Sequence, residues 1–559
     1  MKSQGQQKSW RRALCYAAAV TTLVAGDGRA AEIDTGTPDL ELRWDNTVRY
    51  NIGMRVDSRN AELGNSPLYD EGTFSFDRGD IVTNRVDLLS ELDLVYQGRF
   101  GARVSAAFWY DNAYEEGPKT NPNAPFTSIP SYRGGSYSNY TERYYLGPSG
   151  EILDAFAFAN FDVDDIPVRV KVGRHTVFWG ESLYLGGALH SVSYGQAPID
   201  LQKGFATPGA EIKELFRPLN QVSFQAQVTD DLSLAAQVFL EWEAYRYPEG
   251  GTYLGPVDFA FNGPDRQYIS AALGFATHAS PVEPNQIGEF GLAARWSPDI
   301  LDGTLGFYYR RFADKLPQAL LTRVAPASGS EYALIYPDDI DLFGISFTTN
   351  IGGVSLGTEF SYRHNTPLNA QILGISPIGR PADGSTPGPR GDTQHALINL
   401  LGVLPGNAVF DAATWGTEFT WAHYSDVTSG ENLFNAVGYA PCVGKNKWDG
   451  CATRNFVGWS ASFNPVWFQV VPGIDLSAPM AVSLGLRGNS PTVFGGNEGN
   501  GNYTVGLSAD VQQKYRVDLK WVDYFGHTET TGNAVSSLNG FTTALKDRGF
   551  VSLTLKTTF

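Results

Sequence analysis

Charged side chains at alternating positions are the residues of this chain whose type and spacing point most directly to chemistry. In an extended strand, every second side chain lies on the same face. These charges are therefore predicted to share the inner face of their strands, which lines a lumen when the strands close into a barrel. Rings of charge select ions in a water-filled pore, although a polar lumen also needs charges that simply pair with one another, and both interpretations stay open. The charges concerned are Arg43, Arg49, Arg85, Asp87, Glu91, Asp93, Arg103, Glu359 and Arg363.

A second group of chemically interesting residues lies around the least regular stretch, residues 175–220. Glycines and prolines interrupt the alternation there, and residues 211–217 are compatible with one or two helical turns. We expect this stretch to fold into the lumen as a constriction, with Arg174 and Glu181 paired near it and Trp179 packed beneath. The alternative is a structural ion pair and a packed tryptophan that fasten the loop to the wall.

Patterns typical of enzymes and metal sites fail when their context is considered. Residues 353–357 match G-x-S-x-G, but the serine lies within an alternating strand, whereas a nucleophile elbow needs a strand, a turn and a helix. The seven histidines are scattered, and the turn at residues 162–165 lacks the glycine and distal glutamate of a calcium loop. We therefore predict no enzyme, no cofactor and no metal site, although a Ser–His pair assembled in space, as in a membrane phospholipase, stays open.

The strands that must position these charges are recognised by a period of two. From Leu40 to Met54 the even positions except Asn46 are apolar and the odd positions except Gly53 are polar or charged, which no amphipathic helix produces. The same scheme recurs at 82–96, 102–111, 151–161, 167–174, 221–229, 232–242, 287–297, 303–312, 340–350, 354–363, 393–403, 408–423, 456–468, 476–487, 502–512, 515–524 and 547–559.

The connections between these strands alternate strictly between short and long. Short turns such as 97–99, 229–231 and 351–353 alternate with connections as long as 112–150 and 175–220. Short periplasmic turns and long outer loops are typical of outer-membrane barrels. The sequence therefore predicts one transmembrane antiparallel β-barrel of about 18 strands (16–18), formed by residues 31–559 and located in the outer membrane.

Both ends of the chain carry signals that agree with export. Residues 1–30 combine basic residues, an apolar stretch at 13–26 and a small-residue cleavage site at Ala30 or one residue later. We interpret them as a Sec signal peptide; the Arg11-Arg12 pair resembles a twin-arginine signal only superficially. The last strand alternates up to Phe559, which resembles the last-strand signal that we expect the barrel-assembly machinery to read.

Charge and cysteine content narrow the partners further. The formal net charge is −17, which argues against nucleic-acid binding. It fits contact with outer-membrane lipid and lipopolysaccharide through divalent cations, a cation-attracting lumen, or a role in solubility alone. Beyond the signal segment, the cysteines are Cys442 and Cys451. In an oxidising compartment we expect them to form a disulfide that pins a surface loop, with a two-cysteine metal site as the alternative.

Several stretches together resemble one family, the bacterial outer-membrane proteins of the domain-of-unknown-function 1302 family. Residues 172–182 resemble its Gly-Arg-Gln…Trp-Gly-Glu signature, with His175 where the family usually has glutamine. The other matching stretches are residues 197–200, 208–211 with Glu214, 241–243, 343–347, and 359–363 with Pro367-Leu368.

The resemblance implies a function but no catalytic residues. Family members are linked with a periplasmic lipid-carrier-like protein and an inner-membrane exporter, so we expect passage of a hydrophobic or amphipathic, lipid-like compound across the outer membrane. The polar inward faces favour an alternative, a substrate-selective porin for small polar or aromatic solutes. A non-conducting surface receptor is the third possibility.

Overall fold

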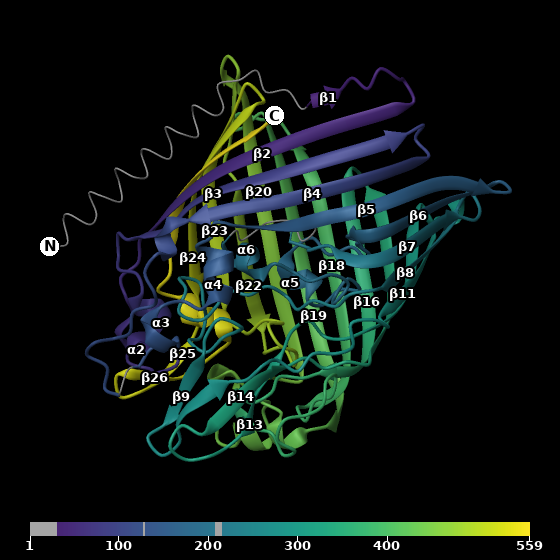
Figure 1. Cartoon of the computed structure of the whole chain (residues 1–559). Helices are drawn as coiled ribbons and strands as arrows, with labels where there is room; N and C mark the ends of the chain where they lie inside the picture. The colour runs from purple at the N-terminus through teal and green to yellow at the C-terminus, as the bar shows by residue number, and fades with distance from the viewer. Residues whose placement is uncertain (1–30, 127–128, 207–214) are drawn as a thin grey trace.

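The computed structural model describes residues 31–126, 129–206 and 215–559 as a closed antiparallel β-barrel of 18 strands (Figure 1). The predicted signal peptide lies outside the described residues, as do Glu211, Glu214 and most of the expected helical turns. The barrel strands are β2 (Leu40–Arg55), β3 (Ile81–Tyr96), β4 (Phe100–Asp111), β5 (Ser149–Val163), β6 (Ile166–His175), β7 (Leu219–Gln227), β8 (Leu232–Phe239), β11 (Phe290–Trp296), β12 (Gly303–Phe312), β15 (Ile340–Ile351), β16 (Val354–Pro367), β18 (Arg390–Pro405), β19 (Ala412–Ser429), β20 (Asn455–Val471), β21 (Ile474–Ser477) with β22 (Met480–Arg487), β23 (Gly501–Val511), β24 (Tyr515–Phe525) and β27 (Phe550–Thr558).

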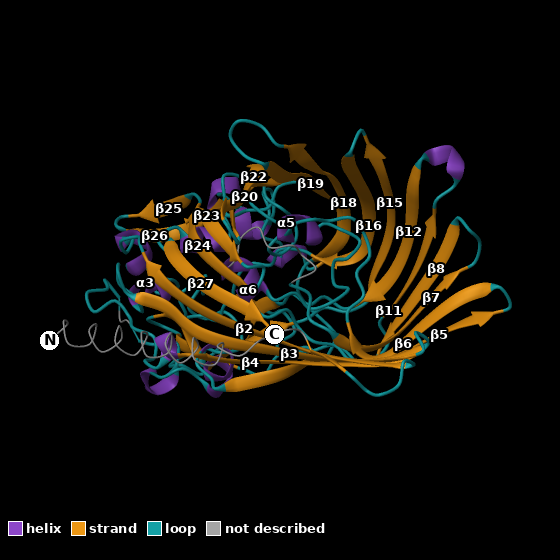
Figure 2. Cartoon of the chain, turned by 90° about the horizontal axis from the view of Figure 1, so that it is seen from above, coloured by secondary structure: helices purple, strands orange, loops and turns teal. Residues whose placement is uncertain are grey.

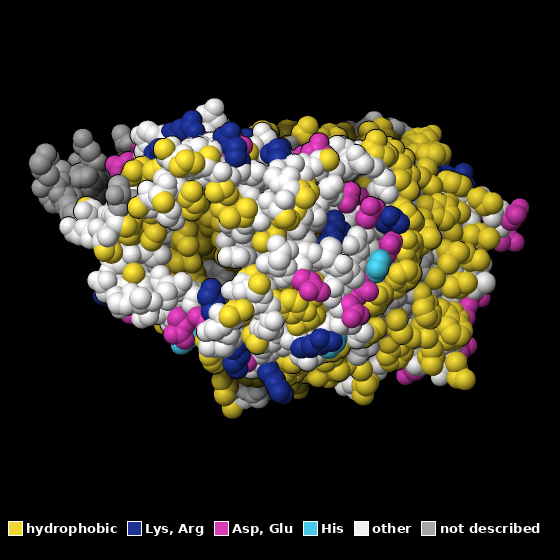
Figure 3. All heavy atoms as spheres, turned by 90° about the horizontal axis from the view of Figure 1, so that it is seen from below, with side chains coloured by type: hydrophobic (Ala, Val, Ile, Leu, Met, Phe, Trp, Pro, Cys, Tyr) yellow, Lys and Arg dark blue, Asp and Glu magenta, His cyan; other side chains and the backbone are white. Residues whose placement is uncertain are grey.

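Alternation along the strands gives the barrel its two faces, as predicted. Leu92, Val104 and Phe108 are at least 41 % exposed on the outer wall, whereas the charges between them face the lumen. Seen from the loop end, hydrophobic side chains cover the visible barrel wall and polar side chains gather on the loop face (Figure 3). A lipid-facing wall and a polar interior require this division.

The short connection between β15 and β16 is a tight turn whose backbone suits its two glycines. Gly352 and Gly353 join β15 to β16 with φ angles of 60° and 86°. Positive φ at both central residues matches the right-handed twist of the flanking strands, and glycine adopts it without strain. Such turns fix the register of the neighbouring strands.

Two features of the sheet differ from the sequence expectation. The predicted strand 476–487 is divided into β21 and β22 because Pro479 has no backbone N–H to donate to the ladder. The long loops also contain strands that were not predicted, which pair with one another in two small sheets outside the barrel sheet. They are β9 (Arg266–Ser270), β10 (Gly274–His278), β13 (Gln318–Arg323), β14 (Ser330–Ile335), β17 (Gly374–Ile375), β25 (Thr528–Thr531) and β26 (Ala534–Leu538), with β1 (Ala31–Ile33) at the other end of the molecule.

The α-helices of the described residues are short and lie in the long connections. They are α2 (Ala61–Gly64), α3 (Asp70–Phe74), α4 (Asn139–Tyr145), α5 (Leu185–Ala188) and α6 (Leu201–Ala206). Within the described residues, none of these helices has the length and apolar character needed to cross a membrane. Figure 2 shows α5 and α6 inside the ring of strands, so part of the long connection 175–220 lies within the barrel.

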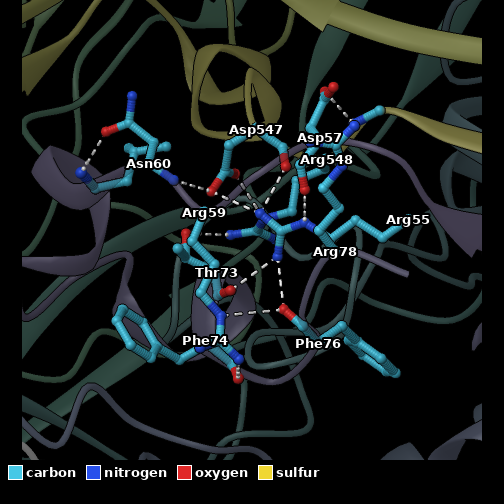
Figure 4. Close-up of polar contacts among 12 residues, drawn as sticks. Arg55, Asp57, Arg59, Asn60, Thr73, Phe74, Phe76, Arg78, Asp547 and Arg548 are labelled. Carbon is cyan, nitrogen blue, oxygen red and sulfur yellow. Dashed lines mark hydrogen bonds and ion pairs between the residues drawn. The ribbon is translucent and has the colours of Figure 1, made fainter. Parts of the chain in front are cut away.

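The barrel closes where the first and last long strands meet. Residues Thr47–Arg55 of β2 pair with Phe550–Thr558 of β27, and Phe559 and Asn46 exchange two backbone hydrogen bonds of 2.7 and 2.9 Å. At the loop end of this seam, the fully buried guanidinium of Arg55 donates to the Asp547 carboxylate (2.9 Å) and to the carbonyls of Thr73 and Phe76 (Figure 4). This buried cluster fastens the first and last outer loops to each other.

The expected disulfide is present in the loop between β19 and β20. Cys442 and Cys451 are bonded, and both residues are buried. The bond closes a small surface loop, as the cysteine spacing predicted.

Candidate functional site

Two buried glutamates of the barrel wall hold the segment that crosses the lumen. We call residues 177–196 the lumen segment. Glu359 of β16 accepts the backbone N–H groups of Glu181 and Val192 (2.8 Å for Val192), and Glu418 of β19 accepts those of Leu183 (2.8 Å) and Tyr184 (3.3 Å). Both carboxylates are at most 5 % exposed. Each thereby provides hydrogen-bond acceptors to loop amides that have no partner in secondary structure.

Two buried arginines hold the carbonyl groups of the same segment. Arg310 of β12 donates to the carbonyls of Val192 (3.1 Å) and Tyr194 (2.6 Å). Arg363 of β16 donates to those of Leu189 (3.2 Å) and Ser191 (3.0 Å), and its guanidinium lies 4.2 Å from the centre of the Tyr194 ring. The lumen segment therefore covers the inner face of the wall formed by β12, β16 and β19.

Two glycines allow the segment to approach these carboxylates closely. A Cβ atom on Gly187 would lie 2.0 Å from Oε1 of Glu418, and one on Gly180 would lie 2.4 Å from Oε1 of Glu359. Gly180 also has a φ of 89°, which other residues rarely adopt. Gly180 is the glycine of the Trp-Gly-Glu stretch, so this stretch encodes the docking of the lumen segment.

Trp179 and Glu181 flank Gly180 and lie against the wall as well. The Trp179 ring, 8 % exposed, lies over Gly291 of β11 and 6.2 Å from the Tyr308 ring. The Glu181 carboxylate is 3.7 Å from Arg295 and accepts a hydrogen bond from Ser346 (3.4 Å). The expected packing of Trp179 beneath the segment is thus present.

The expected Arg174–Glu181 pair is wrong. Arg174 instead pairs with Glu241 (2.8 Å) and Glu243 (2.9 Å) after β8. The reason is topological: Arg174 stays at the loop-side end of β6, whereas the lumen segment carries Glu181 across to β16, where its amide meets Glu359. Arg174 therefore belongs to a charged cluster at the barrel rim.

Six of the seven other predicted charges line a wall that remains open to solvent, and the seventh, Arg43, is 61 % exposed and pairs with Asp45 at 2.7 Å. On β3, Asp87 accepts hydrogen bonds from Arg49 (3.0 Å) and Arg85 (2.8 Å). Farther along the strand, Arg103 of β4 pairs with Glu91 and lies 3.6 Å from Asp93. These six side chains are between 19 % and 40 % exposed. The ladder of charges along β2, β3 and β4 is therefore present, and it is internally paired.

A cavity of about 940 Å³ lies among the outer loops. Its lining includes Tyr140, Tyr144, Trp242, Tyr245, Arg217 and Arg246. Arg246 lies 4.5 Å from the centre of the Tyr144 ring and pairs with Glu151 (2.5 Å), and the Gly195 amide donates to the Tyr245 hydroxyl (3.4 Å). One wall of this aromatic cavity is thus bonded to the lumen segment.

Sequence reasoning missed Glu418, Arg310 and Asn399, which hold the lumen segment together with the predicted Glu359 and Arg363. Asn399 of β18 donates to the Glu181 carbonyl (2.5 Å). All three lie at inward positions of strands that the sequence did predict. The alternation of polar and apolar residues could therefore have predicted that these three side chains point inward. It could not have predicted their contact with the lumen segment, which is more than a hundred residues away in the sequence.

Comparison with solved structures gives low similarity over nearly the whole chain. OccAB4 of Acinetobacter baumannii is 9 % identical, with 93 % of this chain and 98 % of that chain covered and a TM-score of 0.39. Pseudomonas aeruginosa OpdK with vanillate is 9 % identical (93 % and 98 % covered, TM-score 0.38), and P. aeruginosa OprD is 10 % identical (93 % and 94 % covered, TM-score 0.37). No curated protein matches the chain.

The stretches that resemble the domain-of-unknown-function 1302 family include the Trp-Gly-Glu stretch that docks the lumen segment and the β16 residues that receive it. The family model described as protein of unknown function (DUF1302) matches residues 11–559. The chain therefore belongs to this family.

Proposed function

We propose that this chain is an outer-membrane channel whose substrate passes along the wall formed by β2, β3 and β4, opposite the docked lumen segment. The observation that carries the proposal is the contrast between the two walls. Glu359, Arg363, Arg310 and Glu418 are at most 5 % exposed beneath the segment. The six paired charges Arg49, Arg85, Asp87, Glu91, Asp93 and Arg103 on β2 to β4 are between 19 % and 40 % exposed. Hydrated charges in a narrowed lumen favour selective passage of small polar or aromatic solutes.

Single-channel conductance of the refolded protein in a planar bilayer tests this proposal. We expect steady, ion-selective openings. Arg103→Gln leaves Glu91, Asp93 and Asp154 without their cation, so we expect its reversal potential to shift toward greater cation preference. Arg323→Gln, in an exposed pair on the outer loops, is the matched control and should leave selectivity unchanged. A silent barrel, or openings with the same selectivity in all three proteins, would contradict the proposal.

A second candidate, passage of a hydrophobic or amphipathic compound, is favoured by the outer aromatic cavity. Beside charged groups such as Arg217, Arg246 and Glu243, its tyrosine and tryptophan side chains present large apolar faces, and the volume of about 940 Å³ suits an amphipathic ligand of lipid-like size. This candidate predicts a silent or rarely open barrel that binds amphipathic probes. The lipid-carrier-like partner and the exporter implied by the family stay predictions of this second candidate.

A further inference from the structure

Two cations on the lumen face of β6 differ from the other charges of the same wall. Arg49, Arg85 and Arg103 each lie within 4 Å of a carboxylate. Arg169 and Lys171, in contrast, form no ion pair with any described residue. Each lies instead over a phenyl ring of β5: Arg169 is 5.0 Å from the centre of the Phe158 ring, and Lys171 is 5.1 Å from that of Phe156.

Strand alternation and register place this group on the lumen side. Val172 is 50 % exposed on the outer wall, so its neighbour Lys171 points inward. In the register between β4 and β5, Phe156 is opposite Arg103 of the charge ladder. In the same register Phe158 is opposite Gly101, and a Cβ atom on Gly101 would lie 2.4 Å from its ring. The Phe158 ring therefore lies across a position that carries no side chain.

A hydrogen-bonded histidine supports one end of this group. The ring of His175 is 5.5 Å from that of Phe156, and its Nε2 and Nδ1 atoms lie 2.7 Å from the Ser223 hydroxyl and 2.9 Å from the Gly173 carbonyl oxygen. With both nitrogens engaged, the imidazole is a rigid support. Phe156 is thus held between His175 and Lys171.

We propose that Phe156, Phe158, Arg169 and Lys171 form a binding subsite for an aromatic carboxylate in the lumen. The argument rests on the proposed function only in taking the bound solute to be the transported one. Unpaired cations attract the carboxylate, and the adjoining phenyl rings offer stacking to a planar apolar body. Arg103, the next cation along the wall, is surrounded by Glu91, Asp93 and Asp154, so a carboxylate gains less there.

Equilibrium binding to the full chain in lipid nanodiscs tests the subsite with three matched probes. Benzoate has the ring and the charge, cyclohexanecarboxylate lacks the aromatic ring, and benzamide lacks the charge. We expect benzoate to bind several-fold more tightly than either of the others. Replacing a cation that contacts a carboxylate weakens binding about tenfold, so Lys171→Gln should lower benzoate affinity by that factor and leave benzamide unchanged.

Two further variants separate the subsite from general effects of charge or folding. Phe156→Leu should reduce benzoate affinity to that of cyclohexanecarboxylate and leave cyclohexanecarboxylate binding unchanged. Lys520→Gln is the matched control, because Lys520 alternates with the outward-facing Leu519 and Trp521 on β24 and stacks on no described ring. Equal affinity for the three probes, or an equal loss with Lys171→Gln and Lys520→Gln, would overturn the subsite.

Conductance recorded on the same proteins distinguishes failure of the subsite from failure of the channel. Ion-selective openings without a preference for benzoate would leave the channel proposal intact and remove the subsite. A silent barrel that still binds benzoate through Lys171 and Phe156 would support the subsite and remove the channel.

Discussion

At the scale of single residues, the docking of the lumen segment depends on Gly187, because this residue has no side chain. A Cβ on Gly187 would lie 2.0 Å from Glu418 Oε1, whereas the nearest atom to a Cβ on the adjacent Gly186 would be 3.5 Å away. Gly187→Ala should therefore lower the free energy of unfolding by about 1–3 kcal/mol through overpacking. Gly186→Ala has the same gain in helix propensity within α5 and should not be destabilising. Thermal unfolding followed by circular dichroism compares the two variants; equal midpoints would contradict this account of the docking.

The buried cation at the barrel seam has a comparable residue-scale effect. Arg55→Met removes one of the two guanidinium groups that pair with the 3 % exposed Asp547 carboxylate, the other being that of Arg548, and takes this donor from the buried Thr73 carbonyl. A buried acceptor left unpaired costs about 1–3 kcal/mol, and more when it is charged, so we expect the temperature at which the folded barrel loses its resistance to dodecyl sulfate to fall markedly. Arg323, paired with Glu331 at 2.7 Å and 58 % exposed, is the control. Its replacement by methionine should cost at most about 1 kcal/mol, and an equal effect of both variants would argue against the seam cluster.

At the scale of elements, buried carboxyl groups make the packing of the outer loops sensitive to pH. Burial raises the pKa of Glu71, in α3, to about 8 and that of Glu249, in the loop after β8, to about 7. Because both pKa values lie above the unfolded value of about 4.3, their protonated forms stabilise the folded loops. This contribution is complete below that unfolded value and is lost as the pH rises through 7 and 8.

Hydrogen exchange of residues 57–80 and 243–263 measures this loss. After correction for the intrinsic pH dependence of exchange, we expect protection of both loops to fall between pH 6 and pH 9, the range that spans the two pKa values of about 7 and 8. Glu71→Gln removes one titrating group and should flatten the profile. Protection that does not change with pH in the unmodified protein would contradict the assignment.

At the scale of the whole molecule, the barrel could be predicted from the sequence because alternation is a local property. All predicted strand regions contain barrel strands, and one of them is interrupted, at Pro479. The site was less predictable. Glu359 and Arg363 were identified as inward charges, but their partners are backbone groups of residues 181–192, and no local pattern pairs a side chain with a distant backbone. The Arg174–Glu181 pair failed for the same reason, because proximity in sequence does not give the path of a loop across a lumen.

Variants of Phe559 can distinguish the role of this residue in closing the barrel from its role in assembly of the barrel in the cell. Phe559 closes the barrel through its backbone, which donates to and accepts from Asn46. Phe559→Ala keeps this pair, so the refolded variant should unfold within about 1 kcal/mol of the unmodified protein, as expected for a substitution that removes no buried interaction. The assembly machinery, in contrast, is predicted to read the aromatic side chain, so the same variant should accumulate poorly in the outer membrane.

Deletion of residue 559 removes the backbone pair as well and should lower both stability and yield. Outer-membrane yield and thermal unfolding of the refolded proteins are the measurements, and normal yield of Phe559→Ala would show that the terminal ring is not the assembly signal.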